Sequence, residues 1–333
     1  MTDFTGKKIL LFAPFGTTKH YGVAIKNELE RRGAFVASYD ERPSQSLFSK
    51  LAIRFLRDQL PYIFKNYIKR VIAENKETKF DYILICRGEA FTPDIINLLR
   101  EEYPNVKIIF YLWDMLKCLN LNKNIPYADK AMSFDPDDCE SLGQLKFRPT
   151  FFIPEYAQLP DLADSDSDVV FMGSLYLDCN RYAIVDGIRR KLKEQEISLT
   201  PYFFMPSILV FLRNSIVHHP SAKFREVTFT PISIKKYLAI LNKAKAVLDV
   251  NYSGQNSLST RAFECMAARR KYITTNQAVV NYDFYNPNNI LVINPNNPIV
   301  PPSFLSTPFE PIPDNILYKY SVKGLVDDLF LEL

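Results

Sequence analysis

The sequence predicts two doubly wound α/β domains in tandem with a cleft between them, and three observations support this class. Unbroken apolar strands alternate with amphipathic helices, which is typical of a parallel sheet covered on both faces. The alternation stops at residues 147–168, where proline, aspartate and serine crowd together as at an interdomain linker, and then resumes. The length of 333 residues suits two domains of roughly 150 residues each.

In the first half, short apolar runs predict strands and longer amphipathic stretches predict helices. The first helix ends at Gly33, a residue type that favours helix C-termini. A basic and aromatic helical region extends from about Leu47 to Lys76. In order, the expected elements are strand 7–15, helix 21–33, strand 34–40, helix 47–76, strand 80–88, helix 92–104, strand 106–114, strand 128–134 and a helix opened by residues 135–143.

The second half repeats the alternation after the linker. A proline-rich stretch over 295–313 then leads to a last amphipathic helix. In order, the expected elements are strand 169–174, helix 181–195, an apolar run over 202–212, helix 233–244, strand 245–251, a polar loop from Gly254, helix 261–268, strand 271–276, strand 289–294 and helix 315–333.

Composition narrows the class of protein. An apolar fraction of 47% and a charged fraction of 23% are those of a soluble globular protein. The net charge of +4 is well short of the balance of nucleic-acid-binding proteins, so no nucleic acid partner is expected. The five cysteines lie far apart, which argues against a disulfide framework or a zinc site.

The same cysteine usage favours a reducing compartment. No apolar run approaches the roughly 18–20 residues that a membrane span needs. The N-terminal apolar run before Pro14 is short, and we expect it to be a strand and not a signal peptide. The expected location is therefore cytoplasmic.

The strongest candidate site is the run GQNSLSTRAFECMAARRKYITTN, residues 254–276. Ligands of open parallel sheets bind beyond the carboxyl ends of the strands, and a helix N-terminus there favours phosphate. Glu264 lies on the first or second turn of the predicted helix, where it could accept hydrogen bonds from a ribose diol. A capping glutamate stabilised by the helix dipole, with Ser259 or Thr260 as N-cap, explains the same residues.

From Gly254 to Ile293 the chain resembles the C-terminal signature of GT-B glycosyltransferase-like proteins from bacterial capsule and lipopolysaccharide gene clusters. The resemblance covers essentially the whole chain in order, and it departs from the family pattern at 257–259, where Ser-Leu-Ser replaces Gly-Leu-Thr. The other matching pieces are YDERP (39–43), YLWD (111–114), SFDPDD (133–138) and FMGS…NRY (171–182).

The resemblance implies the GT-B fold, with two Rossmann-like domains facing a central cleft. It implies an acceptor-side domain over 1–158, a nucleotide-sugar-binding domain over 165–313, and a final helix, 314–333, that returns to pack on the first domain. It also implies that Glu264 binds the ribose of the nucleotide. The expected donor-site residues are Gly173, Ser174, Arg181, Gln255, Ser257, Ser259, Arg261 and Glu264.

Three of these residues follow the first strand of the second domain. Gly173 and Ser174 are expected to form a tight turn. Arg181 could reach a diphosphate, because its planar guanidinium donates paired hydrogen bonds to phosphate oxygens. An arginine on a solvated helix face is the alternative.

The first domain offers candidates for proton transfer. An inverting transferase needs a carboxylate or histidine to take the proton of the acceptor hydroxyl. Asp114, at the end of a predicted strand, is the first candidate and Glu89 the second, with Arg87 beside them. His20 follows the first strand and is a third candidate. Asp114 could instead cap the turn that follows it.

The acidic stretch at 133–138 could be taken for a metal site, since divalent ions need clustered oxygens. A helix start explains it more simply. Asp135 is an N-cap, Pro136 is the first helical residue, and Asp137 with Asp138 complements the helix dipole. We therefore expect no metal ion and no other cofactor.

Two apolar stretches could touch a membrane. The basic and aromatic region at 47–76 could lie on an anionic surface where lipid-linked acceptors are found, or be an ordinary amphipathic helix pair broken at Pro61. The run at 202–214 is expected to be core, and His218-His219 to lie in a surface loop.

Together these features predict a glycosyltransferase of bacterial surface-polysaccharide assembly. It would move a sugar from a nucleotide-activated donor to a glycan or lipid-linked acceptor. The alternatives are a sugar-nucleotide epimerase or a polyol-phosphate transferase on the same fold, or a non-catalytic scaffold for polysaccharide assembly.

Overall fold

The computed structural model divides the chain into two compact units, residues 1–150 with 319–333 and residues 151–318. The residues that it describes are 2–16, 18–44, 61–119, 121–162, 165–175, 181–209, 211–212, 222–251 and 254–331. The expectations for residues 47–60 and for His218-His219 lie outside these ranges.

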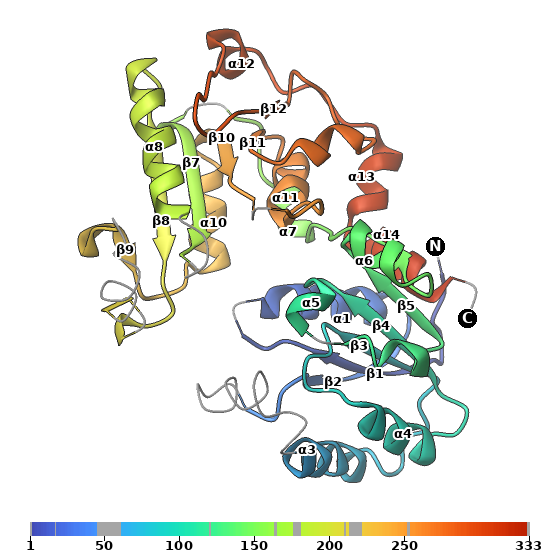
Figure 1. Cartoon of the computed structure of the whole chain (residues 1–333). Coiled ribbons are helices and arrows are strands. Elements are labelled where there is room, and N and C mark those ends of the chain that lie inside the picture. Colours follow the sequence, from blue (N-terminus) through green and yellow to red (C-terminus); the bar gives the residue numbers. More distant parts are fainter. Residues whose placement is uncertain are drawn as a thin grey trace. The chain divides into compact units, whose positions relative to one another are not determined.

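The first unit is a six-stranded parallel sheet with the strand order β2-β1-β3-β4-β5-β6 (Figure 1). Its strands are β1 (Lys8–Ala13), β2 (Phe35–Asp40), β3 (Tyr82–Cys86), β4 (Lys107–Leu112), β5 (Lys130–Ser133) and β6 (Lys146–Phe147). Its helices are α1 (Lys19–Arg31), α3 (Pro61–Glu74), α4 (Pro93–Glu102), α5 (Leu116–Leu119), the 3-10 helix η1 (Ile125–Tyr127), α6 (Pro136–Ser141) and α14 (Val322–Phe330).

The central strands of this sheet are buried on both faces, as the unbroken apolar runs predict. Every residue from Ile9 to Ala13 is inaccessible to solvent. On one face, Leu10 and Phe12 pack in a core with side chains of α3 and α4. A parallel sheet is covered on both faces, so its central strands are apolar at every position and can be predicted from the sequence.

Helix α3 accounts for the described part of the basic and aromatic region. Phe64, Ile68 and Val71 recur at helical spacing and join the core, so α3 is an ordinary amphipathic helix. Pro61 is its first residue, a position where the missing N–H costs nothing. No helix in the part of the chain that the structure describes has the length and hydropathy to cross a bilayer.

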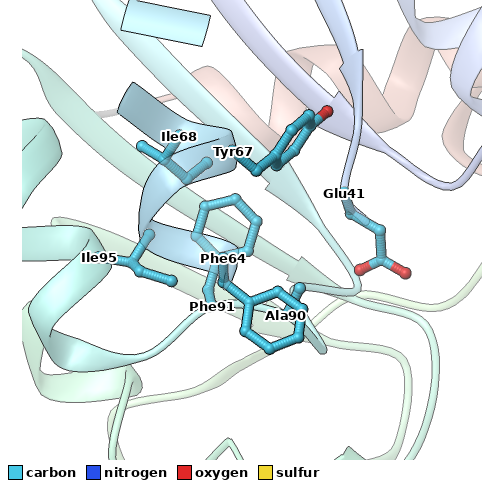
Figure 2. Close-up of a pocket in the computed structure, with 7 residues that line it drawn as sticks. All are labelled: Glu41, Phe64, Tyr67, Ile68, Ala90, Phe91 and Ile95. Atoms are coloured by element: carbon cyan, nitrogen blue, oxygen red, sulfur yellow. The ribbon is translucent and has the colours of Figure 1, made fainter. Parts of the chain in front are cut away.

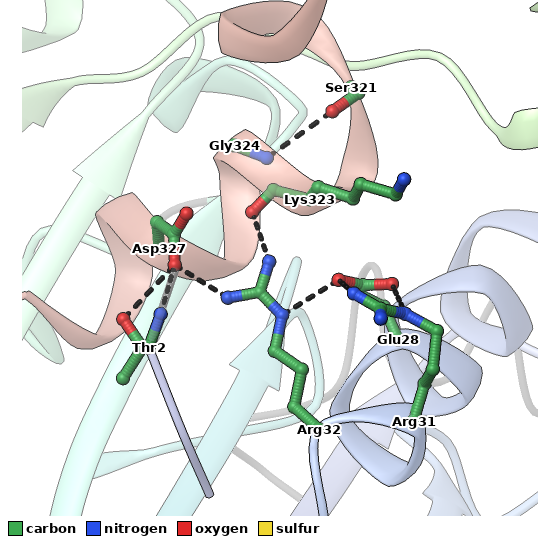
Figure 3. Close-up of polar contacts among 8 residues, drawn as sticks. All are labelled: Thr2, Glu28, Arg31, Arg32, Ser321, Lys323, Gly324 and Asp327. Carbon is green, nitrogen blue, oxygen red and sulfur yellow. Dashed lines mark hydrogen bonds and ion pairs between the residues drawn. The ribbon is translucent and has the colours of Figure 1, made fainter.

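The last helix of the chain belongs to the first unit, where α14 packs against α1. Arg32, directly after α1, is buried and joins the two helices (Figure 3). Its Nε donates to Glu28 Oε1 (2.7 Å), Nη1 to Asp327 Oδ1 (2.5 Å) and Nη2 to the Lys323 carbonyl (2.7 Å). The N-terminal strand is tied to the same place, because Thr2 N donates to Asp327 Oδ1 (2.8 Å).

The single C-terminal helix expected over 315–333 is in fact two helices. Helix α13 (Asp314–Tyr320) ends before Ser321, and α14 begins after it. Ser321 is the N-cap of α14, and its hydroxyl accepts a hydrogen bond from Gly324 N (3.3 Å; Figure 3). A serine cap starts a new helix in the middle of the amphipathic pattern, which the apolar period alone does not reveal.

The second unit is also a six-stranded parallel sheet, ordered β12-β11-β10-β7-β8-β9 (Figure 1). Its strands are β7 (Ser167–Ser174), β8 (Leu199–Phe204), β9 (Val227–Thr228), β10 (Ala244–Asp249), β11 (Lys271–Thr274) and β12 (Ile290–Val292). Its helices are α7 (Pro154–Ala157), α8 (Arg181–Glu194), the 3-10 helix η2 (Phe224–Glu226), α10 (Ile234–Leu241), α11 (Thr260–Ala268), the 3-10 helix η3 (Gln277–Asn281), α12 (Pro302–Ser306) and most of α13.

The division between the units follows Thr150, whereas the proline-rich composition suggested residue 158. The reason lies in two arginines after α11 that hold the linker on the second unit. Arg270 Nη2 donates to the Pro160 carbonyl (3.0 Å), and Arg269 donates to the Leu159 carbonyl and pairs with Asp161. The proline-rich segment after Thr150 is therefore a fixed part of the second unit and not a free linker.

The expectation that the apolar run at 202–214 is core is right for its first part and for Phe211, which packs in the core of the second unit. Phe203 and Met205 are buried with β8. After the strand ends, Leu209 is 74% exposed, and Ile208 and Leu212 are exposed as well. Beside β8 the sheet ends with the two-residue strand β9, so few neighbours are available to cover this segment.

Loss of the Arg32 guanidinium should strongly destabilise the first unit. In Arg32→Ala, the buried Glu28 keeps only the half-exposed Arg31 as a charge partner, and Asp327 and the Lys323 carbonyl lose a donor. We expect the free energy of unfolding to fall by about 3 kcal/mol. Urea unfolding followed by the fluorescence of Trp113, which is the single tryptophan and lies in the first unit, measures this change.

Lys26→Ala is the control on the same helix. Lys26 forms an exposed pair with Glu30 (3.5 Å), and its loss should cost less than about 1 kcal/mol. Equal, small effects of the two substitutions would show that α14 is not held by Arg32.

Candidate functional site

In the second unit, Arg181 lies at the point where the strand order of the sheet reverses. Strands β7 and β10 are neighbours there, and open α/β sheets bind ligands beyond the carboxyl ends of such strands. Arg181 Nη1 donates to the Ser174 carbonyl at the end of β7 (3.4 Å), and Nη2 donates to the Val250 carbonyl after β10 (2.9 Å). The side chain therefore does not extend along a solvated helix face, and its charge is fixed at the reversal point.

The tight turn expected at Gly173 and Ser174 is wrong, because both residues continue strand β7. Gly173 pairs with Phe203 of β8. Packing explains the glycine, since a Cβ at this position would come within 2.7 Å of the Phe171 ring.

The polar loop from Gly254 to Ser259 is held by amide side chains that follow β10 and β11. Asn251 Nδ2 donates to the Gln255 carbonyl (3.4 Å), and Asn276 Nδ2 donates to the Ser257 carbonyl (3.0 Å). Gln255 Nε2 donates to Ser257 Oγ (3.0 Å), and Ser257 is fully buried. Gly254 has a φ of +72°, a conformation that favours glycine. The loop is thus fixed by contacts with the ends of two strands.

Ser259 is the N-cap of α11, which confirms the capping interpretation for this residue. Its hydroxyl accepts from Arg261 N (3.2 Å) and donates to Asp249 Oδ2 (2.7 Å) at the end of β10. Tyr272 of β11 donates to the same oxygen (2.7 Å). Burial and the neighbouring Asp249 raise the pKa of the Tyr272 hydroxyl well above its usual range, so it remains a donor at neutral pH.

Glu264 lies in the second turn of α11 and is 1% exposed. Its carboxylate accepts a hydrogen bond from the Tyr237 hydroxyl (2.8 Å) of α10 and pairs with Arg261. The Arg261 guanidinium lies 4.3 Å from the centre of the Tyr237 ring. A ribose hydroxyl can reach Glu264 only after a neighbouring side chain moves.

In the first unit, five charged side chains meet where β2, β3 and β4 end. Arg87 is at the centre. Its Nε lies 2.7 Å from Asp114 Oδ2, its Nη2 lies 3.1 Å from Glu89 Oε2, and its Nη1 lies 3.6 Å from Glu41 Oε1. Arg42 pairs with Glu41 and Glu89. The structure thus brings together Asp114 and Glu89, the first two candidates for proton transfer.

The two carboxylates differ in access. Asp114 has a side chain that is 44% exposed, whereas that of Glu89 is 8% exposed. Asp114 is therefore the carboxylate that a substrate hydroxyl can approach directly. The third candidate, His20, is a partly exposed residue of the first turn of α1, and its ring lies 4.3 Å from that of Tyr21.

Arg87 has a left-handed backbone, with a φ of +71°, and Gly88 follows at +75°. A side-chain-bearing residue in this conformation costs roughly 1–2 kcal/mol. The contacts of the guanidinium with three carboxylates offset this cost. Residues held in such conformations concentrate at functional sites, which fits the position of Arg87 at the strand ends.

Glu41 is a member of this cluster that was not among the predicted site residues. Its carboxylate accepts from Glu89 N (3.1 Å) and is completely buried. It borders the apolar side chains of Phe64, Tyr67 and Phe91, with no room between them for a water molecule (Figure 2). The signal in the sequence was its place directly after a strand, in the YDERP motif.

Burial raises the pKa of Glu41 to about 7, although Arg87 and Arg42 lower it. A carboxyl in apolar surroundings favours its neutral form in this way. Glu41 is therefore a group of the cluster whose charge changes near neutral pH.

The acidic stretch at 133–138 starts a helix, as the capping interpretation predicted. Asp135 is the N-cap of α6 and accepts from Asp137 N (3.0 Å) and Asp138 N (3.3 Å). Pro136 is the first helical residue. Within the described ranges, no group of three or more histidine, cysteine, aspartate or glutamate side chains is placed to hold a metal ion.

The chain is similar to solved structures over most of its length. The catalytic domain of starch synthase IV from Arabidopsis thaliana, bound to ADP and acarbose, is 9% identical, with a TM-score of 0.56 over 88% of each chain. The lipopolysaccharide outer core galactosyltransferase WaaB, in its apo form, is 12% identical, with a TM-score of 0.54 over 98% of this chain and 100% of that chain.

A third similar structure is the UDP-GlcNAc 2-epimerase of Methanocaldococcus jannaschii, in complex with UDP-GlcNAc and UDP. It is 11% identical, with a TM-score of 0.52 over 97% of this chain and 98% of that chain. No known family model matches the sequence, and no curated protein sequence matches it significantly.

The chain has the GT-B fold. Its two six-stranded parallel sheets with flanking helices match the glycosyltransferase structures above. At identities of 9–12%, these similarities establish the GT-B fold. The reaction has to be inferred from the residues of the two sites.

The raised pKa of Glu41 predicts how stability depends on pH. The folded state keeps the proton up to about pH 7, whereas the unfolded chain releases it near the ordinary value of 4.5. The folded first unit should therefore lose about 3 kcal/mol of stability as the pH rises through this window.

Glu41→Gln removes the titrating group and should flatten this dependence. Urea unfolding at pH 5 and pH 8, followed by Trp113 fluorescence, measures the difference. Glu101→Gln, at an exposed position on α4, is the control and should keep the wild-type slope. An unchanged slope in Glu41→Gln would show that Glu41 ionises normally in the folded protein.

Proposed function

We propose that this protein is a glycosyltransferase that moves a sugar from a nucleotide-activated donor to a hydroxyl acceptor. One observation carries the proposal. In a GT-B fold, the strand-order reversal of the second unit holds a fixed arginine, Arg181, on the Val250 carbonyl, and Val250 stands a few residues before the polar loop and the start of α11 in the chain. An arginine and a helix N-terminus at such a point suit a diphosphate.

The donor belongs in this proposal to the second unit. Arg181 and the start of α11 bind the phosphates, while the loop from Gln255 to Ser259 lines the site. Glu264 binds the ribose diol, as the resemblance of the sequence to GT-B glycosyltransferases implies. Support for a nucleotide also comes from the similar structures, since the starch synthase is bound to ADP and the epimerase to UDP.

The acceptor belongs to the first unit. Asp114 takes the proton of the attacking hydroxyl, because it is the most exposed carboxylate of the Arg87 cluster. Arg87 orients it through an ion pair, in which Arg87 Nε lies 2.7 Å from Asp114 Oδ2. Glu89 and Glu41 pair with Arg87, and Arg42 pairs with both glutamates. No metal ion or other cofactor takes part.

The resemblance to proteins of capsule and lipopolysaccharide gene clusters supports a finer assignment. The reaction is a step of bacterial surface-polysaccharide assembly, and the acceptor is a glycan or lipid-linked glycan at the cytoplasmic face of the membrane. Similarity to a lipopolysaccharide galactosyltransferase agrees with this assignment.

A sugar-nucleotide epimerase is the second candidate, because the epimerase from Methanocaldococcus jannaschii shares the fold. The two reactions differ in what they need. An epimerase converts the sugar nucleotide without an acceptor, whereas a transferase releases free nucleotide only as it glycosylates a hydroxyl. Incubation of the protein with UDP-GlcNAc alone, analysed by chromatography, separates them.

A nucleoside diphosphate should stabilise the folded protein. A ligand at 100 times its Kd adds about 2.7 kcal/mol to the stability of the state that binds it. We expect one of ADP, UDP, GDP, dTDP and CMP to raise the melting temperature in a thermal-shift screen. Glu264→Gln should reduce the shift, whereas Glu155→Gln, at an exposed position on α7, should not. No shift with any nucleotide would overturn the proposed donor site.

Removal of the proposed base should slow transfer without weakening donor binding. Loss of a general base typically costs about 10²–10⁴-fold in rate. We expect Asp114→Asn to lower kcat by such a factor while the nucleotide-induced thermal shift is kept. Glu101→Gln is the exposed control. Full activity of Asp114→Asn would remove Asp114 from the reaction.

A further inference from the structure

The carboxylate assigned to the ribose diol is covered by neighbouring side chains. Glu264 is 1% exposed and accepts a hydrogen bond from Tyr237, and Arg261 pairs with the same oxygen. The two covering residues come from different helices, α10 and α11. A nucleotide therefore finds this carboxylate already occupied by side chains of the protein.

The two covering residues differ in their freedom to move. Tyr237 is buried and packs edge-to-face against Tyr156, with ring centres 5.8 Å apart. Burial raises the pKa of its hydroxyl well above the usual range, with a further contribution from Glu264, so the hydroxyl stays a hydrogen-bond donor. Arg261 is 26% exposed and lies over the outer face of the pair. Arg261 is the residue that can swing out.

The position of Arg261 at the start of α11 would let it bind the phosphate groups of a nucleotide in place of Glu264. It lies in the first turn of α11, and its own N–H is bound by the N-cap Ser259. Helix N-termini attract phosphate, and a guanidinium donates paired bonds to phosphate oxygens. A diphosphate at this end of α11 thus competes with Glu264 for the same guanidinium.

We propose that Arg261 is a specificity-determining residue that uncovers Glu264 only when a phosphate group is present. The diphosphate draws the guanidinium away, and the freed carboxylate accepts hydrogen bonds from the ribose diol while Tyr237 holds it in place. A nucleoside has no phosphate to bind Arg261 in place of Glu264. The nucleoside therefore has to break the Arg261–Glu264 pair, and no new bond to Arg261 offsets the loss. The protein thereby rejects nucleosides. This mechanism rests on the proposed donor site.

The test compares each diphosphate with its own nucleoside. Binding of ADP and adenosine, UDP and uridine, GDP and guanosine, and dTDP and thymidine is measured by calorimetry on the full chain. For the base that binds, Arg261→Ala should weaken the diphosphate by roughly 10- to 100-fold, the range for losing bonds to a charged group. The same variant should bind the nucleoside more tightly than the wild type does. Glu264→Gln should weaken both ligands.

The directions in which Arg261→Ala changes the diphosphate affinity and the nucleoside affinity distinguish the explanations. If Arg261→Ala leaves the nucleoside affinity unchanged, Arg261 is only a phosphate ligand and the proposal fails. If the variant weakens both ligands equally, Arg261 only supports the local structure and the proposal also fails. If the wild type binds no diphosphate, the proposed donor site itself is wrong, which is a separate result.

Matched variants guard against unfolding and nonspecific charge effects. Arg189 on α8 forms a similar pair three residues away, with Asp186, and its side chain is 29% exposed. Arg189→Ala should change neither affinity. Arg261→Lys keeps the charge but lacks the planar fork, so it should lie between the wild type and Arg261→Ala for the diphosphate. Circular dichroism and thermal unfolding confirm that each variant is folded.

Discussion

Parallel strands all end at one edge of a sheet, and both candidate sites depend on this constraint. Carbonyl groups and polar side chains gather at that edge, because the sheet itself cannot pair them all. In each unit a guanidinium joins the ends of different strands of the sheet. Arg181 connects the ends of β7 and β10 through two carbonyls, and Arg87 connects the ends of β2, β3 and β4 through three carboxylates.

The arginine side chains of the two units contact different kinds of acceptor. Arg181 donates to two backbone carbonyls, those of Ser174 and Val250. In the first unit, the guanidinium groups of Arg87 and Arg42 face three carboxylates, and the cluster is negative when all five groups are ionised. A negative cluster repels phosphate and suits the removal of a proton.

Sequence patterns predicted the central strands, the helix caps and the place of the polar loop, because each depends on residues close together in the chain. Some of the features that they missed depend on distant partners, and others on local details that the apolar pattern does not mark. Glu41 acquires its environment from elements that follow it by more than twenty residues, and Glu264 is covered by Tyr237 from α10. Strand β6 has only two residues, both exposed, so no apolar run marks it. Gly173 was assigned to a turn because the contact with Phe171 within the strand is invisible in sequence.

The attachment of α14 to the first unit has a consequence for how the protein is made. A ribosome releases residues 151–318 before residues 319–333, so the second unit has its whole sequence available while the first still lacks its last helix. Domains generally fold as units during synthesis. The N-terminal unit can therefore complete its fold only after residues 319–333 have been made, and the surface of α1 that meets α14 stays uncovered until then.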